Sequence, residues 1–484
     1  MDRDLQSIQE ARDIIHKSKG AQKILAEKSQ EEIDALIEVI ARAGEDHAIE
    51  LAELAVQETG FGNRKDKITK NVLASRVLYD FIKDMKTIGI VHKDEKNGLV
   101  EIAVPYGVVA GLVPSTNPTS TVIYKTMICI KSGNSVVFSP HPSAQKCIGR
   151  TVEIMREAVA SQGLPKDLVN VLPICTMEAT DTLLKHEETS LILATGGSAM
   201  VKAAYSSGTP ALGVGPGNVP VFIEHTADIK DAVKKIIVGK TFDNGLICAS
   251  EQSVVVEKCI EEEVREEFKR NHCYFCTPEE KKKMEAIIDN KTGGLNNKIV
   301  GKYAVELAKM AGIEVPEDTV IIIADETEVG PGHPFSREKL SPLLGFYVEE
   351  NWEEACDKCI ELLNYGGLGH SLGIHSKNKD VILEFALKKP VSRMLVNTPT
   401  TLGGVGATTG LAPSFTLGCG AVGGSATSDN VTPLNLFTKR RLAYGINEIY
   451  ELSPEREQVT TTNWDTERMV EKILKVVMEE IAGN

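Results

Sequence analysis

The sequence has few aromatic residues, no long apolar run and no excess of basic residues. Only 5% of its 484 residues are Phe, Trp or Tyr. No stretch of about eighteen uncharged apolar residues occurs, which argues against a membrane-spanning helix. Lys and Arg number 54 against 68 Asp and Glu, and the formal net charge is −14. A nucleic-acid surface needs clustered positive charge, so we expect neither a nucleic-acid nor a membrane partner.

The ten cysteines do not have the spacing of a disulfide framework. They are scattered through long elements and no secretory signal precedes them, so we expect free thiols in a reducing, cytoplasmic compartment. Two C-x-x-C pairs, Cys273 with Cys276 and Cys356 with Cys359, raise the alternative of a four-cysteine zinc site. Because about eighty residues separate the pairs, we expect no metal.

The order of apolar patterns predicts an α/β protein with a doubly wound parallel sheet. Residues up to about 90 have helical periodicity, with Ser29 and Glu32 as a capping box. From about residue 100, short runs such as GVVAGLV, SVVF and LILAT alternate with helical segments. This alternation indicates parallel strands joined by right-handed crossovers, and ligands bind such sheets where the strands end in loops.

The pattern also predicts segment boundaries. A second α/β series begins near residue 228 and runs to about 415, and a Gly-rich stretch follows. The segment 450–484 has a polar linker and then a helix with one apolar face. That face consists of Val470, Leu474, Val477 and Ile481.

Four short segments are candidates for chemistry. Cys248 stands in a loop between a helix and an apolar strand, where a thiol can be exposed and positioned, although a small buried hydrophobic residue is the alternative. Asn117, in T-N-P, is by itself a typical turn residue. Gly196 and Gly197 form a strand–turn–helix arrangement in which Ser198 can cap the helix; a plain turn is the alternative. The G-x-G-x-x-G at residues 418–423 precedes no helical pattern and is not a dinucleotide motif.

The string FDNGLICASEQSVV resembles the active-cysteine motif of the acylating branch of the aldehyde dehydrogenase superfamily. That branch includes the aldehyde dehydrogenase half of bifunctional aldehyde/alcohol dehydrogenases. Further motifs match in the family's order over roughly residues 1–449. They are VPSTNPTST at 113–121, FSPHPSAQK at 138–146, LATGGSAMVKAAYSSG at 193–208, GVGPGN at 213–218, EKLSP at 338–342 and LAPSFTLGCGAVGG at 411–424.

The resemblance implies an aldehyde dehydrogenase-like fold, with a Rossmann-type cofactor domain, a second α/β catalytic domain and a small oligomerisation segment. It assigns residues 1–227 to NAD and CoA binding under a helical N-terminal cover, and 228–415 to the catalytic domain that carries Cys248. Residues 416–449 become a return segment and oligomerisation region, and residues 450–484 the linker and amphipathic helix. A homodimer or homotetramer is expected.

The resemblance also implies the chemistry. Cys248 attacks a short-chain aldehyde, with acetaldehyde as first choice, NAD takes the hydride, and coenzyme A takes the acyl group. The Asn117 amide and the Cys248 backbone N–H stabilise the oxyanion. His370 assists thiol deprotonation, or is a structural imidazole. Glu338 resembles the carboxylate that contacts the nicotinamide ribose, or is a solvated charge. The expected cofactor-binding residues are Pro114, Ser139, His141, Gly196, Gly197, Ser198, Gly215, Glu338 and Leu417.

Two departures from hydrolytic aldehyde dehydrogenases matter. Those enzymes place a water-activating glutamate about thirty-four residues before the cysteine, where this chain has Val214. Without that general base, water attack on the thioester is slow and a coenzyme A thiolate becomes the acceptor. His141 stands where hydrolytic relatives usually carry a lysine near the adenosine ribose, which leaves the choice between NAD and NADP open.

Alternatives remain at this point. The C-terminal helix resembles peptides that carry enzymes into bacterial microcompartments, with a shell contact through residues 465–482, or it docks on its own oligomer. Propionaldehyde, succinic semialdehyde and sulfoacetaldehyde compete with acetaldehyde, and the direction of reaction is open. A non-acylating semialdehyde dehydrogenase, an acyl phosphate reductase and a non-catalytic scaffold relative are the rival functions.

Overall fold

The protein is described here by a computed structural model that covers residues 2–290, 293–447, 471–473 and 475. Contacts within the chain define two units. The first comprises residues 1–91 and 102–440, and the second comprises residues 92–101 and 441–484. In the described ranges, no helix combines the length and the apolar character that crossing a bilayer requires.

The first unit contains a five-stranded parallel sheet with the order β5-β4-β3-β6-β7. Successive residues of its strands belong to opposite cores: Val109 and Phe138 lie in one, Ala110 and Val137 in the other. Because both faces are buried, the strands are continuous apolar runs. The strands are β3 (Val108–Val113), β4 (Ser135–Pro140), β5 (Val169–Val171), β6 (Thr189–Thr195) and β7 (Ala211–Val214).

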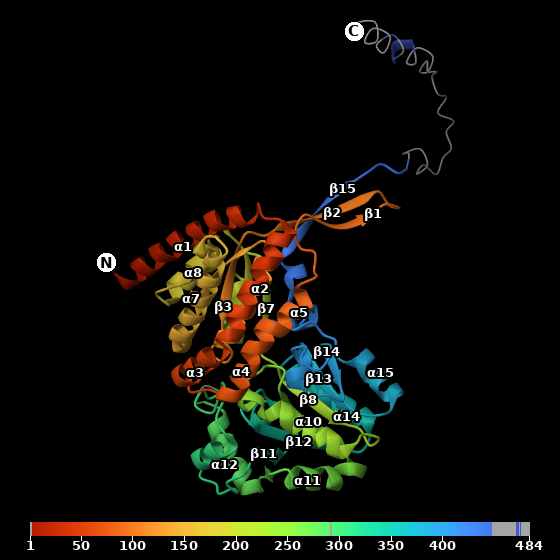
Figure 1. Ribbon diagram of the computed structural model, residues 1–484. Coiled ribbons are helices and arrows are strands. Elements are labelled where there is room, and N and C mark those ends of the chain that lie inside the picture. The colour runs from red at the N-terminus through yellow and green to blue at the C-terminus, as the bar shows by residue number, and fades with distance from the viewer. Residues whose placement is uncertain (1, 291–292, 448–470, 474, 476–484) are drawn as a thin grey trace. The chain divides into compact units, whose positions relative to one another are not determined.

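Helices cover both faces of this sheet (Figure 1). The Ser29 hydroxyl accepts from the Glu32 N–H at 3.3 Å and the Glu32 carboxylate accepts from the Ser29 N–H at 2.8 Å, so the predicted capping box is confirmed. The helices before the second sheet are α1 (Arg3–Leu25), α2 (Gln30–Asp46), α3 (Ala48–Thr59), α4 (Arg64–Val72), α5 (Leu78–Ile82), α6 (Pro118–Lys131), α7 (Gln145–Ser161), α8 (Met177–Lys185) and α9 (Ser198–Tyr205).

A seven-stranded parallel sheet has the order β10-β11-β12-β9-β8-β13-β14. Its strands are β8 (Val219–Ile223), β9 (Glu251–Glu257), β10 (Cys273–Phe275), β11 (Ile321–Asp325), β12 (Leu343–Glu349), β13 (Gly369–His375) and β14 (Val391–Val396). Its helices are α10 (Ile229–Thr241), α11 (Glu261–Arg270), α12 (Pro278–Ile288), α13 (Ala304–Ala311), α14 (Trp352–Tyr365), α15 (Lys379–Lys388) and α16 (Thr400–Gly404). The sequence pattern predicted that the second α/β series begins near residue 228. Because β8 pairs with β9 and β13, the second sheet begins earlier in the chain, at Val219.

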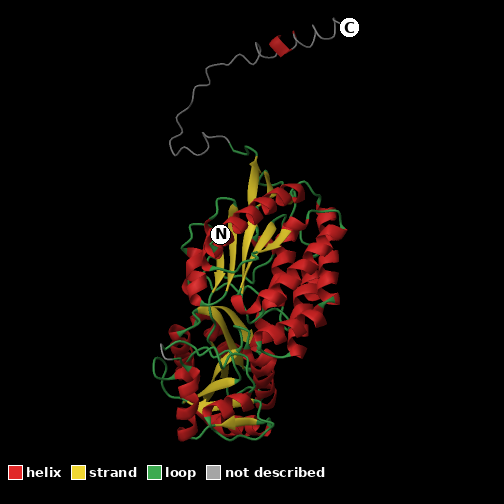
Figure 2. Ribbon diagram, turned by 90° about the vertical axis from the view of Figure 1, so that its left-hand side faces the viewer, coloured by secondary structure: helices red, strands yellow, loops and turns green. Residues whose placement is uncertain are grey.

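Figure 2 shows the strands of both parallel sheets between helices, so the predicted doubly wound α/β class is confirmed. A third sheet has the order β1-β2-β15, formed by Ile90–Asp94, Leu99–Pro105 and Phe437–Ala443. The apolar face predicted for the C-terminal helix, Val470 to Ile481, lies outside the described residues.

Candidate active site

Cys248 follows a tightly turned loop between α10 and β9. Three successive residues of this loop have positive φ: Asp243 at 48°, Asn244 at 55° and Gly245 at 76°. Asp, Asn and Gly tolerate this left-handed conformation better than bulkier residues do. Asn244 links this loop to a distant segment by donating from Nδ2 to the Gly301 carbonyl at 2.9 Å. The local sequence DNG therefore sets the turn that leads to the thiol.

Cys248 is partly exposed, whereas its neighbours Ile247 and Ala249 are buried. Although the residue is partly exposed, desolvation of its sulfur by the surrounding protein and the nearby Glu338 carboxylate raise the pKa of the Cys248 thiol to about 12, and Arg393 opposes this only in part. Near neutral pH the thiol is therefore protonated. Attack on a carbonyl requires its proton to be taken by a base.

The Cys248 side chain borders a cavity of about 610 Å³. Strands β3, β4 and β6 end at this cavity, and carboxyl ends of parallel strands are the common ligand-binding edge of such sheets. The predicted site residues that line the cavity are Pro114, Asn117, Ser139, His141, Gly196, Gly197, Gly215, Cys248 and Glu338. The structure thus gathers residues from distant motifs around one space.

Two predictions for cofactor-binding residues differ from the structure. Leu417 is buried, 1% exposed, and does not line the cavity. Helix α9 begins at Ser198 and its N-cap is Gly197, so the prediction that Ser198 caps this helix is wrong. The cap is the flanking residue with extended backbone, and Gly197 has φ −66° and ψ 161°.

Asn117 occupies the N-cap position of α6, directly before Pro118, but its side chain makes no capping hydrogen bond. Its Oδ1 accepts from Lys70 Nζ at 2.6 Å, and its Nδ2 donates to Thr116 Oγ1 at 3.2 Å. A turn role alone does not account for these contacts. The amide lines the cavity, where its nitrogen can donate to an oxyanion.

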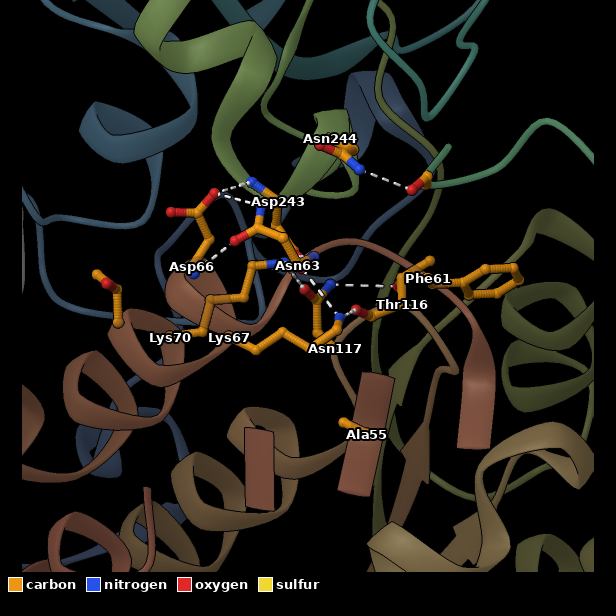
Figure 3. A network of polar contacts seen from close by, with 12 residues as sticks. Ala55, Phe61, Asn63, Asp66, Lys67, Lys70, Thr116, Asn117, Asp243 and Asn244 are labelled. Atoms are coloured by element: carbon orange, nitrogen blue, oxygen red, sulfur yellow. Dashed lines mark hydrogen bonds and ion pairs between the residues drawn. The ribbon is translucent and has the colours of Figure 1, made fainter. Parts of the chain in front are cut away.

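A buried ionic network joins α4 to the nucleophile loop (Figure 3). The Asp243 carboxylate accepts from Lys70 Nζ at 2.5 Å, from Lys67 Nζ at 3.0 Å and from the Asn63 N–H at 2.8 Å. Removing one partner of a buried ion pair costs about 3–5 kcal/mol. The sequence did not reveal this network, because Asp66, Lys67 and Lys70 in one helix are typical of a solvated face.

Glu338 is the only acidic side chain among the described residues that line the cavity. Its Oε1 accepts from the Gly217 N–H at 3.0 Å. Burial raises the pKa of the Glu338 carboxyl to about 7, so it can exchange a proton near neutral pH. This position differs from that of a solvated surface charge, the alternative left by the sequence.

His370 lies behind the nucleophile rather than in the cavity wall. Gly217 lies between the Cys248 backbone and the His370 ring. If Gly217 had a Cβ, that atom would be 2.0 Å from the Cys248 carbonyl oxygen and 3.4 Å from the His370 ring. The imidazole is fully buried, with Nδ1 3.0 Å from Ser371 Oγ and Nε2 without a hydrogen-bond partner. Burial and Arg393 lower the pKa of His370 to about 3, so the ring is neutral and a weak proton acceptor. Its role as a base stays a prediction.

Val214 is the last residue of β7, lines the cavity and is 2% exposed. In the described residues, the segment after Gly420 forms only the short turn Ala421–Gly423 and no α-helix, as the sequence pattern predicts. All ten cysteines are free thiols. Among the described residues, the only group with metal-ligand spacing is Glu224, His225 and Glu257, and it contains no cysteine.

Comparison with known proteins identifies the class. A model of the aldehyde dehydrogenase family matches residues 4–310. The chain is 42% identical over 442 residues to the bifunctional aldehyde-alcohol dehydrogenase AdhE of Escherichia coli K12, a match that covers 90% of this chain and 50% of that protein. The chain therefore belongs to the aldehyde dehydrogenase family, and spans about half the length of the bifunctional relatives that it matches.

Solved structures extend this result to the acylating branch. An acetylating aldehyde dehydrogenase from Geobacillus thermoglucosidasius has a TM-score of 0.91 at 52% identity, covering 93% of this chain and 99% of that one. A propionaldehyde dehydrogenase from the Clostridium phytofermentans fucose utilisation bacterial microcompartment has a TM-score of 0.81 at 31% identity, covering 90% and 97%. The Rhodopseudomonas palustris propionaldehyde dehydrogenase with bound propionyl-CoA has a TM-score of 0.81 at 28% identity, covering 90% and 94%. The predicted fold and the resemblance drawn from the motifs are confirmed.

Proposed function

We propose that this chain is an NAD-dependent, CoA-acylating aldehyde dehydrogenase that converts a short-chain aldehyde to its acyl-CoA. One observation carries the proposal: Cys248, Asn117 and Val214 share a cavity with the carboxyl ends of β3, β4 and β6. The motif resemblance implies that Val214 stands where hydrolytic enzymes have their glutamate. The cavity therefore combines a thiol, an amide that can donate to an oxyanion, and the edge of a parallel sheet at which dinucleotides bind. It has no carboxylate at position 214 to activate water.

The cavity fits a dinucleotide at its carboxyl edge. A Cβ on Gly197 would meet nothing within 4 Å, so a ligand can approach the backbone at the start of α9. A helix N-terminus carries partial positive charge, which favours a diphosphate. Ser139 lies at the carboxyl end of β4, His141 follows this strand, and both line the cavity. When bound there, NAD supplies the hydride acceptor.

The protein's own groups perform the acylation. The proton of the Cys248 thiol passes to a base. The proposed base is Glu338, whose carboxyl has a pKa of about 7 and lines the same cavity. The Cys248 thiolate then bonds to the aldehyde carbon, and the Asn117 amide donates to the resulting oxyanion. Loss of hydride from that carbon leaves a thioester on Cys248.

Coenzyme A is the proposed acyl acceptor. Its thiolate attacks the thioester carbonyl, the Cys248–carbon bond breaks, and the Cys248 thiolate leaves. Val214 cannot activate water, so hydrolysis does not compete by general-base catalysis from that position. The propionyl-CoA bound to the Rhodopseudomonas palustris relative supports this choice.

The substrate is proposed to be a small neutral aldehyde, with acetaldehyde first. The described residues that line the cavity include no Lys or Arg. A sulfonate or a second carboxylate would therefore lack a cationic partner, which disfavours sulfoacetaldehyde and succinic semialdehyde. The same lining offers no cation for a 2′-phosphate, and this favours NAD over NADP.

An aldehyde panel assayed with and without CoA tests the proposal. We expect NADH formation from acetaldehyde or propionaldehyde that requires CoA, and a matching yield of acyl-CoA. Continuous NADH formation without CoA would indicate a hydrolytic enzyme. No NADH from any aldehyde would favour the non-catalytic alternative, which alkylation of Cys248 blocked by aldehyde would separately exclude.

We also propose a homodimer or homotetramer, and a targeting role for residues 465–482 in a bacterial microcompartment. The exposed side chains of Leu442, Tyr444 and Ile446 in the second unit support self-association. The microcompartment origin of a structural relative supports the targeting role. Light scattering of the full chain and of a chain ending at residue 449 separates targeting from an oligomer contact: an unchanged number of subunits per particle favours targeting, and a smaller number favours the oligomer contact.

A further inference from the structure

Lys70 places a buried ammonium group next to the side-chain amide of Asn117, the proposed oxyanion donor. Its side chain is 1% exposed, and the ammonium lies 2.6 Å from Asn117 Oδ1 and 2.5 Å from Asp243 Oδ2. Figure 3 shows the three side chains converging. Burial lowers the pKa of Lys70 to about 8 while Asp243 acts to raise it, so Lys70 is charged near neutral pH.

This contact fixes which end of the Asn117 amide faces the ammonium. A Lys ammonium can only donate, so it can pair with Oδ1 and not with the NH₂ group. A flipped amide would place N–H groups against the ammonium and would lose a charge-assisted hydrogen bond. Nδ2 is therefore held at the opposite end, where its partner in the described structure is Thr116 Oγ1 at 3.2 Å.

The ammonium also ties the amide to the nucleophile loop. Asp243, which accepts from Lys70, belongs to the left-handed turn that precedes Cys248. Its backbone N–H donates to Asp66 Oδ2 at 2.7 Å, and its Oδ1 accepts from the Asn63 N–H at 2.8 Å. Both anchors lie at the start of α4. The amide and the thiol therefore have one common buried support.

We propose that Lys70 is a positioning residue for oxyanion stabilisation: it holds Asn117 with Nδ2 directed to the reacting carbonyl and in register with the Cys248 loop. The inference rests on the proposed function of Asn117 as an oxyanion donor. The ammonium also withdraws electron density from the amide, which makes Nδ2–H a better donor.

Lys67 provides a matched control within the same network. It lies one turn earlier on α4, is also buried, and donates to the same Asp243 Oδ2 at 3.0 Å. Its second partner is the Thr116 carbonyl at 3.2 Å rather than the Asn117 side chain. Removing Lys67 therefore disturbs the ion network while leaving the Lys70–Asn117 contact in place.

A double-mutant cycle tests the proposal in the full-length enzyme. We expect Lys70→Met to lower kcat roughly 10- to 100-fold with aldehyde KM within about threefold, since a misplaced oxyanion donor should cost less than the roughly 10²- to 10³-fold that its removal costs. In an Asn117→Ala background, Lys70→Met should lower kcat by less than about threefold. Lys67→Met should have the same effect on kcat in both backgrounds. Equal effects of Lys70→Met in both backgrounds, or an unchanged kcat in the single variant, would overturn the proposal.

A second variant covers failure of Lys70→Met to fold. Lys70→Gln retains a hydrogen-bond donor without the charge. We expect its kcat to exceed that of Lys70→Met, or its loss of kcat to be likewise smaller in the Asn117→Ala background than in the wild type. Independence of Asn117 in a folded Lys70→Gln enzyme would contradict positioning. The proposed function is judged separately: a wild-type enzyme without CoA-dependent turnover would overturn that function, whereas an active wild type with independent effects overturns only the role of Lys70.

Discussion

The two parallel sheets present opposite edges to the cavity. The five-stranded sheet contributes its carboxyl ends, through the residues after β3, β4 and β6. The seven-stranded sheet contributes its amino ends, since Cys248 precedes β9 and Glu338 precedes β12. At the carboxyl edge, backbone N–H groups and helix starts can hold an anion. At the amino edge, side chains must supply the reactivity.

The difference predicts that side-chain changes at the amino edge act on chemistry and that added bulk at the carboxyl edge acts on cofactor binding. Asn117 links the carboxyl edge of the first sheet to the amino edge of the second. It follows β3, yet its side chain is held by Lys70 and through it by the nucleophile loop.

The largest expected effect is at the amino edge. Cys248→Ala should lower kcat by at least about 10⁴-fold, because the covalent intermediate can no longer form. The rate of NADH formation with CoA measures it. Cys259→Ala is the control, since this exposed cysteine lies after β9 and away from the cavity. Residual activity within tenfold of wild type would remove Cys248 from the mechanism.

The thiol should also respond steeply to pH in the free enzyme. A pKa of about 12 leaves little thiolate at neutral pH, so alkylation of Cys248 by iodoacetamide should rise about tenfold per pH unit from roughly pH 6 to pH 9. Peptide mass spectrometry follows Cys248 separately from Cys259. A plateau below pH 8 would show that the thiol pKa lies near neutrality instead.

Asn117→Ala should cost about 3–4 kcal/mol of transition-state stabilisation, a loss in kcat of roughly 10²- to 10³-fold. The aldehyde KM should change little, because the amide acts on the oxyanion and not on the free carbonyl. Steady-state kinetics with acetaldehyde measures both constants. An unchanged kcat would reduce Asn117 to a turn residue.

Val214→Glu should shift the enzyme toward hydrolysis. A carboxylate at this cavity position can activate water, and CoA-independent NADH formation should rise at least about tenfold. Val214→Gln has a similar size without the base and serves as control. Equal rates in the two variants would show that position 214 does not decide the acceptor.

The smallest effect is expected at the carboxyl edge. Gly197→Val adds bulk where a Cβ meets no protein atom, so thermal stability should fall only by about 1 kcal/mol for the poorer N-cap residue. The NAD KM should rise roughly tenfold, about 1.4 kcal/mol of binding. Gly149→Ala, in α7 and equally free of contacts, is the control. An unchanged NAD KM would place the cofactor away from α9.

Local patterns predicted what is local. Apolar runs identified the strands, S-x-x-E identified the capping box, and motif order identified the family. Ser198 was wrongly assigned as a cap, because a helix start can be placed only to within a residue from sequence.

The sequence did not reveal how α4 supports the site. Lys70 and Asp243 are 173 residues apart, and each is ordinary in its own segment. Their burial depends on how α4 packs against the loop before β9. The exposed fraction of His370 was equally out of reach, since a histidine after G-L-G can line a cavity or, as here, lie wholly buried.

The central claim is that Cys248 carries an acyl group which water removes slowly and CoA removes quickly. Mixing the enzyme with acetaldehyde and NAD, without CoA, should produce one burst of NADH and a peptide containing Cys248 that is heavier by about 42 Da. Adding CoA should release the acetyl group and restart NADH formation. Steady NADH formation without CoA, with no adduct on Cys248, would contradict the account.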